Sequence, residues 1–418
     1  MIYRNITAHI KAALSDSPVV LLNGARQSGK STLVKKIASD IHPARYLTLD
    51  DAGVLAAAKY DPAEFIAGLD GNIVIDEVQR APELFLAIKA EVDRNRKPGR
   101  FLLTGSANVM LLPKLSESLA GRMEILTLWP LSQGEIEGVR EGFIDAVFGD
   151  KLPSFSKTTE DRTQTIKRLL LGGYPEVIGR ATLSRRKAWF GSYITTILQR
   201  DVRDLAHIEG LTILPRVLSL IAARAASLLN FSELSRSIGI PQTTLKRYMS
   251  LLETTFLLQP LPAWSGNLGK RLVKAPKVML NDTGLVSNLI GLYEDGVETH
   301  QGIIGAVLEN FVAMELRKQE AWSKMQPQVF HFRTQTGQEV DIALENAAGK
   351  VVGIETKASK SVNAQDFKGL QTMSESLGPR FHRGIVLYTG SEGIPFGKNM
   401  QALPVSALWT LGALKNTK

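Results

Sequence analysis

The stretch GARQSGKST, residues 24–32, combines small, basic and hydroxyl-bearing residues at a spacing that suits phosphate chemistry. Gly24 and Gly29 let the backbone bend so that its N–H groups point inward, and Lys30 and Ser31 follow at once. In such a loop the lysine reaches the β- and γ-phosphates of a nucleoside triphosphate, and the hydroxyl ligates Mg²⁺. The spacing therefore predicts a P-loop (Walker A motif) whose contacts come from Gly24, Ala25, Arg26, Gln27, Ser28, Gly29, Lys30, Ser31 and Thr32.

Two carboxylates follow an apolar run farther along the chain. The run occupies residues 73–75 and ends in Asp76 and Glu77. An aspartate at the carboxyl end of a buried strand would hold Mg²⁺ through water, and the next glutamate would polarise the attacking water as a general base. Behind a P-loop, this pair predicts the hydrolytic half of the nucleotide site.

Two more residues are candidates for catalysis. Ser106 follows a third apolar run, near Thr104 and Asn108, and could sense the γ-phosphate or orient the water; the alternative is a simple turn. Arg122 could contact the γ-phosphate in the same subunit or in a neighbouring subunit of an oligomer, as arginine fingers do, or it could form a structural ion pair.

These residues need a parallel sheet to position them. Residues 19–22 form a continuous apolar run typical of a central parallel strand, and the apolar spacing after Lys30 indicates a helix. Asp50 and Asp51, which close another strand, are predicted to form a turn or a helix cap. The expected fold is α/β, beginning with a P-loop sheet covered by helices.

The motifs resemble those of a known group, the AAA-type P-loop ATPases of bacteria and archaea that carry a C-terminal domain of unknown function. The resemblance rests on GARQSGKST, IVIDEVQRAPEL, LLTGSAN and LAGRMEILTLWPLS, and continues in GGYPEV and YITTILQRDV, so it covers most of the chain. It implies ATP binding with Mg²⁺ and slow or regulated hydrolysis. It implies no settled biological role.

The middle of the chain is basic and has a helix-turn-helix pattern. Residues 211–280 carry nine Lys and Arg against two Asp and Glu, a surplus that favours a polyanionic partner. Leu229, Leu234 and Ile238 would share one face of a short helix, and a second helix would start near Thr243. Its exposed residues suit DNA contacts: Gln242, Thr243, Thr244, Lys246 and Arg247.

A wing hairpin would follow, with Lys270, Arg271, Lys274 and Lys277 placed against the DNA backbone. This makes a winged helix the expected fold of the segment. Two functions stay open for it, because a winged helix can bind DNA or serve as a rigid module for protein contacts.

The last part of the chain contains an ordered set of ionisable residues. Glu309 lies in an amphipathic helix, Asp341 begins a strand, and period-two alternation puts Glu355 and Lys357 on one face of the next strand. The set resembles the restriction-endonuclease-like nuclease fold. That resemblance implies Mg²⁺ on Asp341 and Glu355, water activation by Lys357 and support from Glu309; the alternative is a retired nuclease fold kept as a binding scaffold.

The bulk numbers fit a protein of several domains. The chain has 418 residues, a net charge of +9 and no cysteine, which excludes disulfides and thiolate metal sites. No apolar tract long enough to span a bilayer is free of charge, and no signal-peptide layout is found, so the cytoplasm is the expected location and no membrane partner is expected. We expect an ATPase domain at residues 1–150, a helical and winged-helix domain at 165–290 and a restriction-endonuclease-like α/β domain at 295–418, with a linker near 150–165.

Two functions remain open at this stage. The first is an ATPase switch that acts on or near nucleic acid, with ATP and Mg²⁺ bound between Lys30, Ser31, Asp76 and Glu77. The second is an ATP-dependent regulatory protein whose C-terminal half binds a protein partner without nuclease activity. A small-molecule kinase is disfavoured, because no compact acceptor-binding lid follows the P-loop.

Overall fold

The structure is a computed structural model that describes residues 2–108, 119–151, 153–155, 157–201, 211–267, 269, 271, 274–297 and 301–415. It divides into two compact units. One comprises Arg4–Pro130 and Leu251–Leu257, and is called here the N-terminal unit; the other comprises Met1–Tyr3, Leu131–Ser250 and Leu258–Lys418, and is called the C-terminal unit.

The N-terminal unit is built on a parallel sheet in the order β2-β3-β4-β1-β5. Its strands are β1 (Val19–Asn23), β2 (Arg45–Thr48), β3 (Ile73–Asp76), β4 (Phe101–Gly105) and β5 (Met123–Thr127). β1, β3 and β4 are buried along their whole length, as their unbroken apolar runs require. The predicted N-terminal parallel sheet with helices is confirmed.

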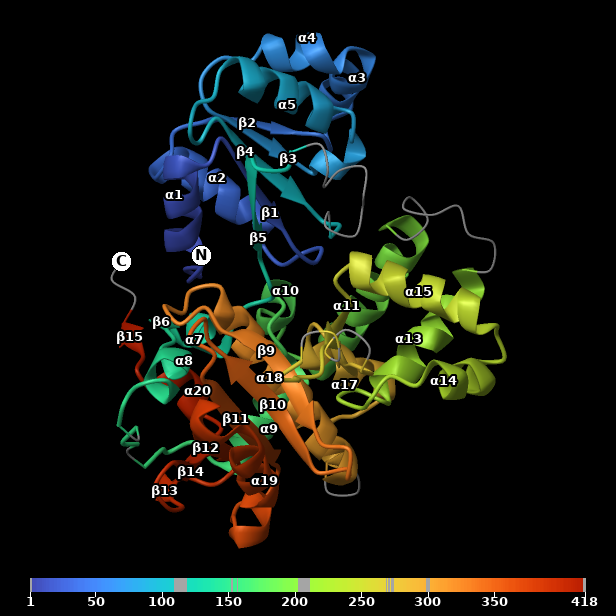
Figure 1. Cartoon of the computed structure of the whole chain (residues 1–418). Coiled ribbons are helices and arrows are strands. Elements are labelled where there is room, and N and C mark those ends of the chain that lie inside the picture. Colours follow the sequence, from blue (N-terminus) through green and yellow to red (C-terminus); the bar gives the residue numbers. More distant parts are fainter. Residues whose placement is uncertain are drawn as a thin grey trace. The chain divides into compact units, whose positions relative to one another are not determined.

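Helices cover both faces of this sheet (Figure 1). α1 (Thr7–Asp16) and α2 (Lys30–Asp40) lie on one side, and α3 (Ala52–Tyr60), α4 (Pro62–Ala67) and α5 (Leu84–Arg94) lie on the other, with the 3-10 turn η1 (Val78–Arg80) after β3. The α3–α5 face packs on Val19, Leu21, Ile73 and Ile75 to form one core. Asp51 caps α3 by accepting a hydrogen bond from the N–H of Val54, as predicted.

The first part of the C-terminal unit is helical. It contains α9 (Arg162–Leu171), α10 (Pro175–Ile178), α11 (Leu183–Thr196), the π-helix η3 (Ile197–Asp201), η4 (Leu211–Ile213), α13 (Leu214–Ala222), α14 (Phe231–Ile238), most of α15 (Gln242–Thr254) and α17 (Thr283–Ile290). The residues of α15 from Leu251 onward belong to the N-terminal unit. Asn230 caps α14, and Gly239, with φ +80°, makes the tight turn into α15. The predicted helix–turn–helix elements are therefore present. β7 (Leu258–Leu261) and β8 (Lys277–Leu280) pair antiparallel after them.

The second part is a mixed sheet in the order β13-β14-β12-β11-β10-β9. Its strands are β9 (Gln328–Arg333), β10 (Glu339–Glu345), β11 (Val351–Lys357), β12 (Phe381–Tyr388), β13 (Ile394–Pro395) and β14 (Met400–Pro404). β9, β10 and β11 are antiparallel neighbours, whereas β11, β12 and β14 run parallel. The helices are η5 (Glu294–Gly296) and α18 (Gln301–Glu320) before the sheet, and η6 (Ala364–Phe367), α19 (Lys368–Leu377) and η7 (Gly378–Arg380) between β11 and β12.

The division between the two compact units falls between Pro130 and Leu131. The segment after Pro130 forms α7 (Gln133–Glu137), β6 (Val139–Arg140) and α8 (Phe143–Val147), near α20 (Ala407–Thr410). β6 pairs with β15 (Leu414–Lys415). The Leu131 N–H donates to Gly173 O at 2.8 Å, and Lys318 Nζ donates to Leu131 O at 3.0 Å. These long-range bonds, which sequence periodicity does not reveal, tie residues 131–150 to the C-terminal unit.

The expected linker near residues 150–165 also makes contacts within the C-terminal unit. The Thr158 N–H donates to Ser391 O at 2.9 Å, and Arg162 Nε donates to Ala358 O at 3.1 Å. Among the helices the structure describes, none has the length and apolar character needed to cross a bilayer.

Candidate functional site

The P-loop connects β1 to α2 and needs glycine at both ends. Gly24 has φ +145°, and a Cβ there would overlap the carbonyl of Leu128. Gly29 has φ +99° and immediately precedes the first residue of α2. Both conformations disfavour side chains, so the spacing of the two glycines follows from the backbone path. The N-terminus of α2 then points its free N–H groups at the loop, an arrangement suited to anions.

Lys30 lies under this loop. Its Nζ donates to Gly24 O at 2.8 Å and to Ala25 O at 2.9 Å, and the residue is buried. The ammonium is therefore held at the loop by the loop's own carbonyls. This is where a β- or γ-phosphate oxygen would need a positive charge.

Ser31 and Asp76 meet at the carboxyl edge of the sheet. Ser31 Oγ donates to Asp76 Oδ1 at 3.2 Å, and Thr104 Oγ1 also donates to that oxygen. Tyr46 OH donates to Asp76 Oδ2 at 2.6 Å. Hydroxyl and carboxylate oxygens are the donors that Mg²⁺ prefers, so these residues fit an ion bound beside a triphosphate.

Tyr46 is a site residue that the sequence argument missed. It lies on β2, next to β3 in the sheet, and only that strand order brings its phenol to Asp76. Burial and the Asp76 hydrogen bond raise the pKa of Tyr46, so it remains a donor at all physiological pH values. An aromatic residue in a strand gives no separate signal for this role.

Glu77 is held in an uncommon backbone conformation, φ +61°, at the end of β3. Its N–H donates to Thr104 Oγ1 at 3.0 Å. Its carboxylate accepts hydrogen bonds from Ser106 Oγ, at 3.2 Å, and from Gln79 Nε2. Gln79 also donates to Ser106 Oγ at 2.8 Å. The structure thus brings Ser106 and Glu77 together and adds Gln79, which the sequence did not single out.

Arg122 lies at the other edge of the sheet. It immediately precedes β5, its carbonyl accepts from the N–H of Val19 at the start of β1, and its Nε donates to Asp93. The P-loop follows the far end of β1, about 15 Å away at the usual rise per strand residue. Arg122 therefore forms the structural ion pair, and contact with a phosphate in the same subunit does not fit this position.

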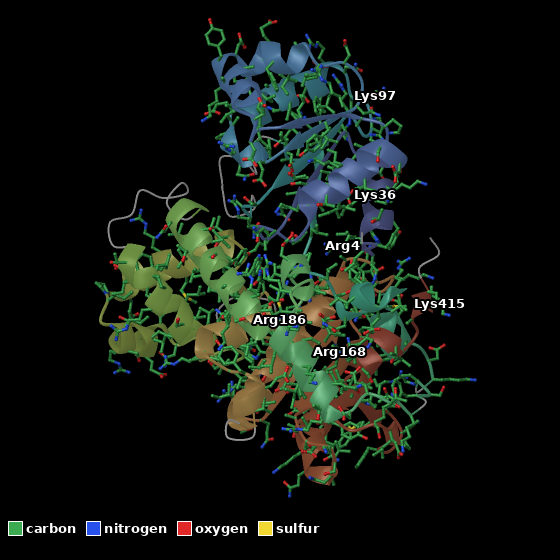
Figure 2. The ribbon with its side chains drawn as sticks, turned by 180° about the vertical axis from the view of Figure 1, so that it is seen from behind. Arg4, Lys36, Lys97, Arg168, Arg186 and Lys415 are labelled. Atoms are coloured by element: carbon green, nitrogen blue, oxygen red, sulfur yellow. The ribbon has the colours of Figure 1, made fainter. Side chains whose placement is uncertain are left out.

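Arg4, which is labelled in Figure 2, is another site residue that the sequence did not single out. This buried residue donates from NH1 to Ser28 O at 2.7 Å and from NH2 to Trp129 O at 2.6 Å. It therefore links the P-loop to the chain after β5. No local motif at the start of the sequence signals this contact.

The candidate DNA-binding residues of α15 differ in exposure from those of the wing. Gln242, Thr243, Lys246 and Arg247 are exposed, and Thr244 is half-buried. Two of the four cations expected to lie against the DNA backbone are instead paired within the chain. Arg271 pairs with Glu345 at 2.7 Å, and Lys277 is buried against Glu309. Lys274 donates to Arg333 O, and Lys270 lies outside the described residues.

The four residues of the carboxylate set come together in the C-terminal unit. Asp341 lies at a bulge in β10, where its Oδ2 accepts from the N–H and the hydroxyl of Thr356, both at 2.8 Å. Lys357 Nζ donates to Glu355 Oε1 at 3.1 Å on β11. Lys277 joins them, with its Nζ 2.5 Å from Glu309 Oε1 and 3.7 Å from Asp341 Oδ1.

Charge and burial in this cluster argue against a divalent ion. Burial and the Asp341 charge raise the pKa values of Glu309 and Glu355, and the neighbouring ammonium groups of Lys277 and Lys357 oppose this rise. Burial alone would lower the pKa of Lys277, but Glu309 and Asp341 raise it, so its cation stays between them. Among the described residues, no three His, Cys, Asp or Glu are placed to hold a metal. The cluster does not fit a metal while Lys277 is in place.

The fold and the P-loop geometry define the class of protein. Residues 16–137 match the family model for an AAA domain, and the unit has an AAA-type P-loop ATPase fold. Two further models match the rest, both described as domains of unknown function: DUF8612 over residues 162–296 and DUF4143 over residues 304–408.

The chain belongs to the family of the uncharacterized protein Rv2008c of Mycobacterium tuberculosis and Mb2031c of Mycobacterium bovis. It is 30% identical to each over 412 residues, which cover 98% of this chain and 85% of the relative. Among solved structures, the Walker-type ATPase Paby2304 of Pyrococcus abyssi is 14% identical, with a TM-score of 0.44 over 69% of this chain and 96% of that one. The Thermotoga maritima RuvB Holliday junction branch migration motor is 18% identical, with a TM-score of 0.29 over 62% of this chain and 89% of that one.

Proposed function

We propose that the chain binds ATP with Mg²⁺ at residues 24–32 and hydrolyses it. The observation that carries this proposal is the meeting of Ser31 Oγ and Asp76 Oδ1 at 3.2 Å, beside the buried Lys30 ammonium. These three groups supply a hydroxyl and a carboxylate for the ion and a cation for the phosphates. Lys30 and Ser31 begin α2, which follows β1 and the P-loop, and Asp76 ends β3, so the sheet holds these groups in register.

Each residue has a separate part in this proposal. Lys30 and the backbone N–H groups of the P-loop bind the phosphates, and Ser31 and Asp76 hold the ion. Bound Mg²⁺ would offset the negative charge that develops on the leaving phosphates. Glu77 accepts the proton of the attacking water, and Gln79 and Ser106 orient its carboxylate through the hydrogen bonds described above.

Domain boundaries remain a proposal too. We place the ATPase domain at residues 4–130 and treat the helical and C-terminal sheet segments as one downstream module, with ATP hydrolysis as the switch that acts on it. This proposal is supported by the chain connection between Pro130 and Leu131, because the N–H of Leu131 is hydrogen-bonded to Gly173 O in the C-terminal unit. Oligomer formation and a location in the cytoplasm belong to the same proposal.

Nucleic acid is the partner we favour for the helix-turn-helix segment. The exposed Lys246 and Arg247 on α15 support it, together with the basic surplus of residues 211–280. The alternative, a protein partner, is favoured by the internal pairing of Arg271 and Lys277, which removes two cations from a DNA-binding wing.

We infer that the C-terminal module resembles a nuclease fold but does not cleave DNA. The order α18, β9, β10, β11, α19, β12 and the clustering of Glu309, Asp341, Glu355 and Lys357 support the resemblance. Lys277 argues against DNA cleavage, because its ammonium group pairs with the carboxylates of Glu309 and Asp341 that a metal would need. Metal-dependent cleavage of DNA by the wild-type chain would overturn this inference.

The main proposal is tested by measuring ATP binding and ATP turnover in two variants and in one control variant. Lys30→Ala should lose both binding, measured by calorimetry with Mg²⁺, and turnover. Glu77→Gln should keep binding and lose turnover, because the amide cannot take a proton. Lys36→Ala, on the exposed side of α2, should behave as wild type (Figure 2). Equal turnover in Lys30→Ala and wild type would refute the P-loop assignment, and turnover measured with and without DNA tests the partner.

A further inference from the structure

A pocket in the C-terminal unit lies among α9, α11 and α17, away from the carboxylate cluster. Its volume is about 420 Å³, which falls in the range of pockets that bind small organic molecules. The lining comes from residues 167–171, 183–190 and 284–294. Every element that forms it belongs to the C-terminal unit.

The lining carries a surplus of positive charge. Lys167, Arg168, Arg186 and Lys187 contribute to it, against the single carboxylate of Glu294. Arg168 is already paired, since its guanidinium contacts Glu137 at 2.7 Å and Glu160 at 3.1 Å. Lys167, Arg186 and Lys187 have no carboxylate partner in the part of the chain that the structure describes. Three uncompensated cations around one pocket favour a ligand with more than one negative charge.

Aromatic and aliphatic side chains complete the lining. Phe190 and Tyr293 contribute rings, and the Lys187 Nζ lies 3.4 Å from the centroid of the Tyr293 ring. Leu170, Leu183 and Leu292 add apolar surface. A ligand made only of charge, such as free phosphate, would leave this surface in water, so the pocket suits an anion that also carries a planar apolar group.

Ser287 gives a second and independent indication of a ligand. It lines the pocket from α17, is only 2% exposed, and its Oγ has no hydrogen-bond partner among the described residues. A buried hydroxyl without a partner costs free energy, which a polar ligand atom would recover. Neighbouring Asn288 adds an amide to the same wall.

We propose that this pocket binds a nucleoside phosphate at a second site, separate from the P-loop. Arg186, Lys187 and Lys167 contact the phosphates, Tyr293 packs on the base, and Ser287 hydrogen-bonds a polar group of the base or the sugar. Guanidinium groups pair well with phosphate oxygens, and aromatic faces accept any flat ring. This site does not depend on the proposed ATPase function, because it shares no residue with the P-loop.

The test uses the full chain carrying Lys30→Ala, so that P-loop binding is removed. Fluorescent N-methylanthraniloyl-ADP is titrated at low salt without Mg²⁺. We expect saturable binding near one site per chain, competed by ADP and more weakly by pyrophosphate, which lacks the planar ring. Lys187→Glu and Arg186→Glu, each added to Lys30→Ala, should weaken it ~10-fold or more, the usual effect of losing a charged hydrogen bond.

Matched controls make the outcome decisive. Arg185→Glu changes the same charge on α11 at an exposed position outside the pocket and should leave the affinity within about twofold. Lys187 is exposed, so its variant should fold even if Arg186→Glu does not. Absence of binding in Lys30→Ala, equal weakening by Arg185→Glu, or displacement by an acidic peptide but not by ADP would each overturn the proposal.

Discussion

The phenol of Tyr46 donates a hydrogen bond of 2.6 Å to Oδ2 of Asp76, the carboxylate that also receives the Ser31 hydroxyl on its other oxygen. Tyr46 thus fixes the direction in which Asp76 presents its oxygens. Loss of a side chain that orients a metal ligand typically lowers metal affinity about 10- to 100-fold.

We expect Tyr46→Phe to raise the Mg²⁺ concentration needed for half-maximal ATP turnover ~10-fold, because it removes only this hydrogen bond. Titration of turnover with MgCl₂ at saturating ATP measures the effect. Tyr60→Phe removes a hydroxyl from a side chain that is 94% exposed and should change nothing. An unchanged Mg²⁺ requirement in Tyr46→Phe would mean that Asp76 needs no help in orientation.

Replacement of Lys277 by methionine should lower the free energy of unfolding of the C-terminal unit by about 3–5 kcal/mol, because it leaves Glu309 and Asp341 buried without their cation. Chemical denaturation followed by tryptophan fluorescence measures this loss. The double variant Lys277→Met, Glu309→Gln should regain much of it, since a neutral pair avoids the cost of an unpaired charge. A double variant no more stable than the single one would contradict the ion-pair explanation.

Gly173→Ala should destabilise the C-terminal unit by ~2 kcal/mol or more, because a Cβ at this position would overlap the carbonyl of Leu131. Thermal unfolding checks the change. Gly179 lies six residues farther along, has open space around its Cβ position, and serves as the control. If Gly173→Ala and Gly179→Ala unfold alike, the GGYPEV motif has another basis than close packing.

The stability of the C-terminal unit should fall as pH rises from about 4.5 to about 7 on account of Glu141. Burial raises the pKa of this carboxyl from 4.5 to about 7, so the folded state binds a proton that the unfolded state has released in this window. The contribution is complete below pH 4.5 and is lost above pH 7, and it amounts to about 3 kcal/mol. Glu141→Gln, whose amide oxygen can still accept from the N–H of Gly134, should remove this pH dependence. Denaturation midpoints of the wild type and Glu141→Gln are compared at pH 5 and pH 8. An equal change of midpoint between the two pH values in both proteins would refute the role of Glu141.

If α15 binds DNA, Lys246→Ala with Arg247→Ala should reduce the slope of log affinity against log salt by about 2, one for each lost phosphate contact. Fluorescence anisotropy with labelled duplex at several salt concentrations measures the slope. The pair Lys360→Ala, Lys398→Ala removes two exposed lysines elsewhere and should leave the slope unchanged. Binding that does not vary with salt would favour a protein partner instead.

Site residues that lie in one short segment could be predicted from the sequence. Contacts between residues on different strands or turns could not. The P-loop and Asp76 are each set by a few consecutive residues after an apolar strand, so spacing alone indicates them. Tyr46 contacts Asp76 across the sheet and Gln79 contacts Glu77 through a turn, and both residue types occur everywhere in proteins.

Lys277 shows why the basic composition of the segment suggested a cation on the wing that the structure places in the core. A lysine in a basic segment is usually solvated, and nothing local distinguishes one that enters a core. The structure pairs it with Glu309 across 32 positions of sequence. The same kind of long-range bond, between Leu131 and Gly173, ties Leu131 to the C-terminal unit.

The lysine at position 277 also offers a way to sort relatives by sequence alone. Where a homologue keeps the acids equivalent to Glu309 and Asp341 but carries an uncharged residue at this position, nothing internal balances the two acids. Divalent-ion binding and phosphodiester cleavage should be tested first in such a homologue. In a homologue that keeps the basic residue, that residue is the counter-ion of the two acids.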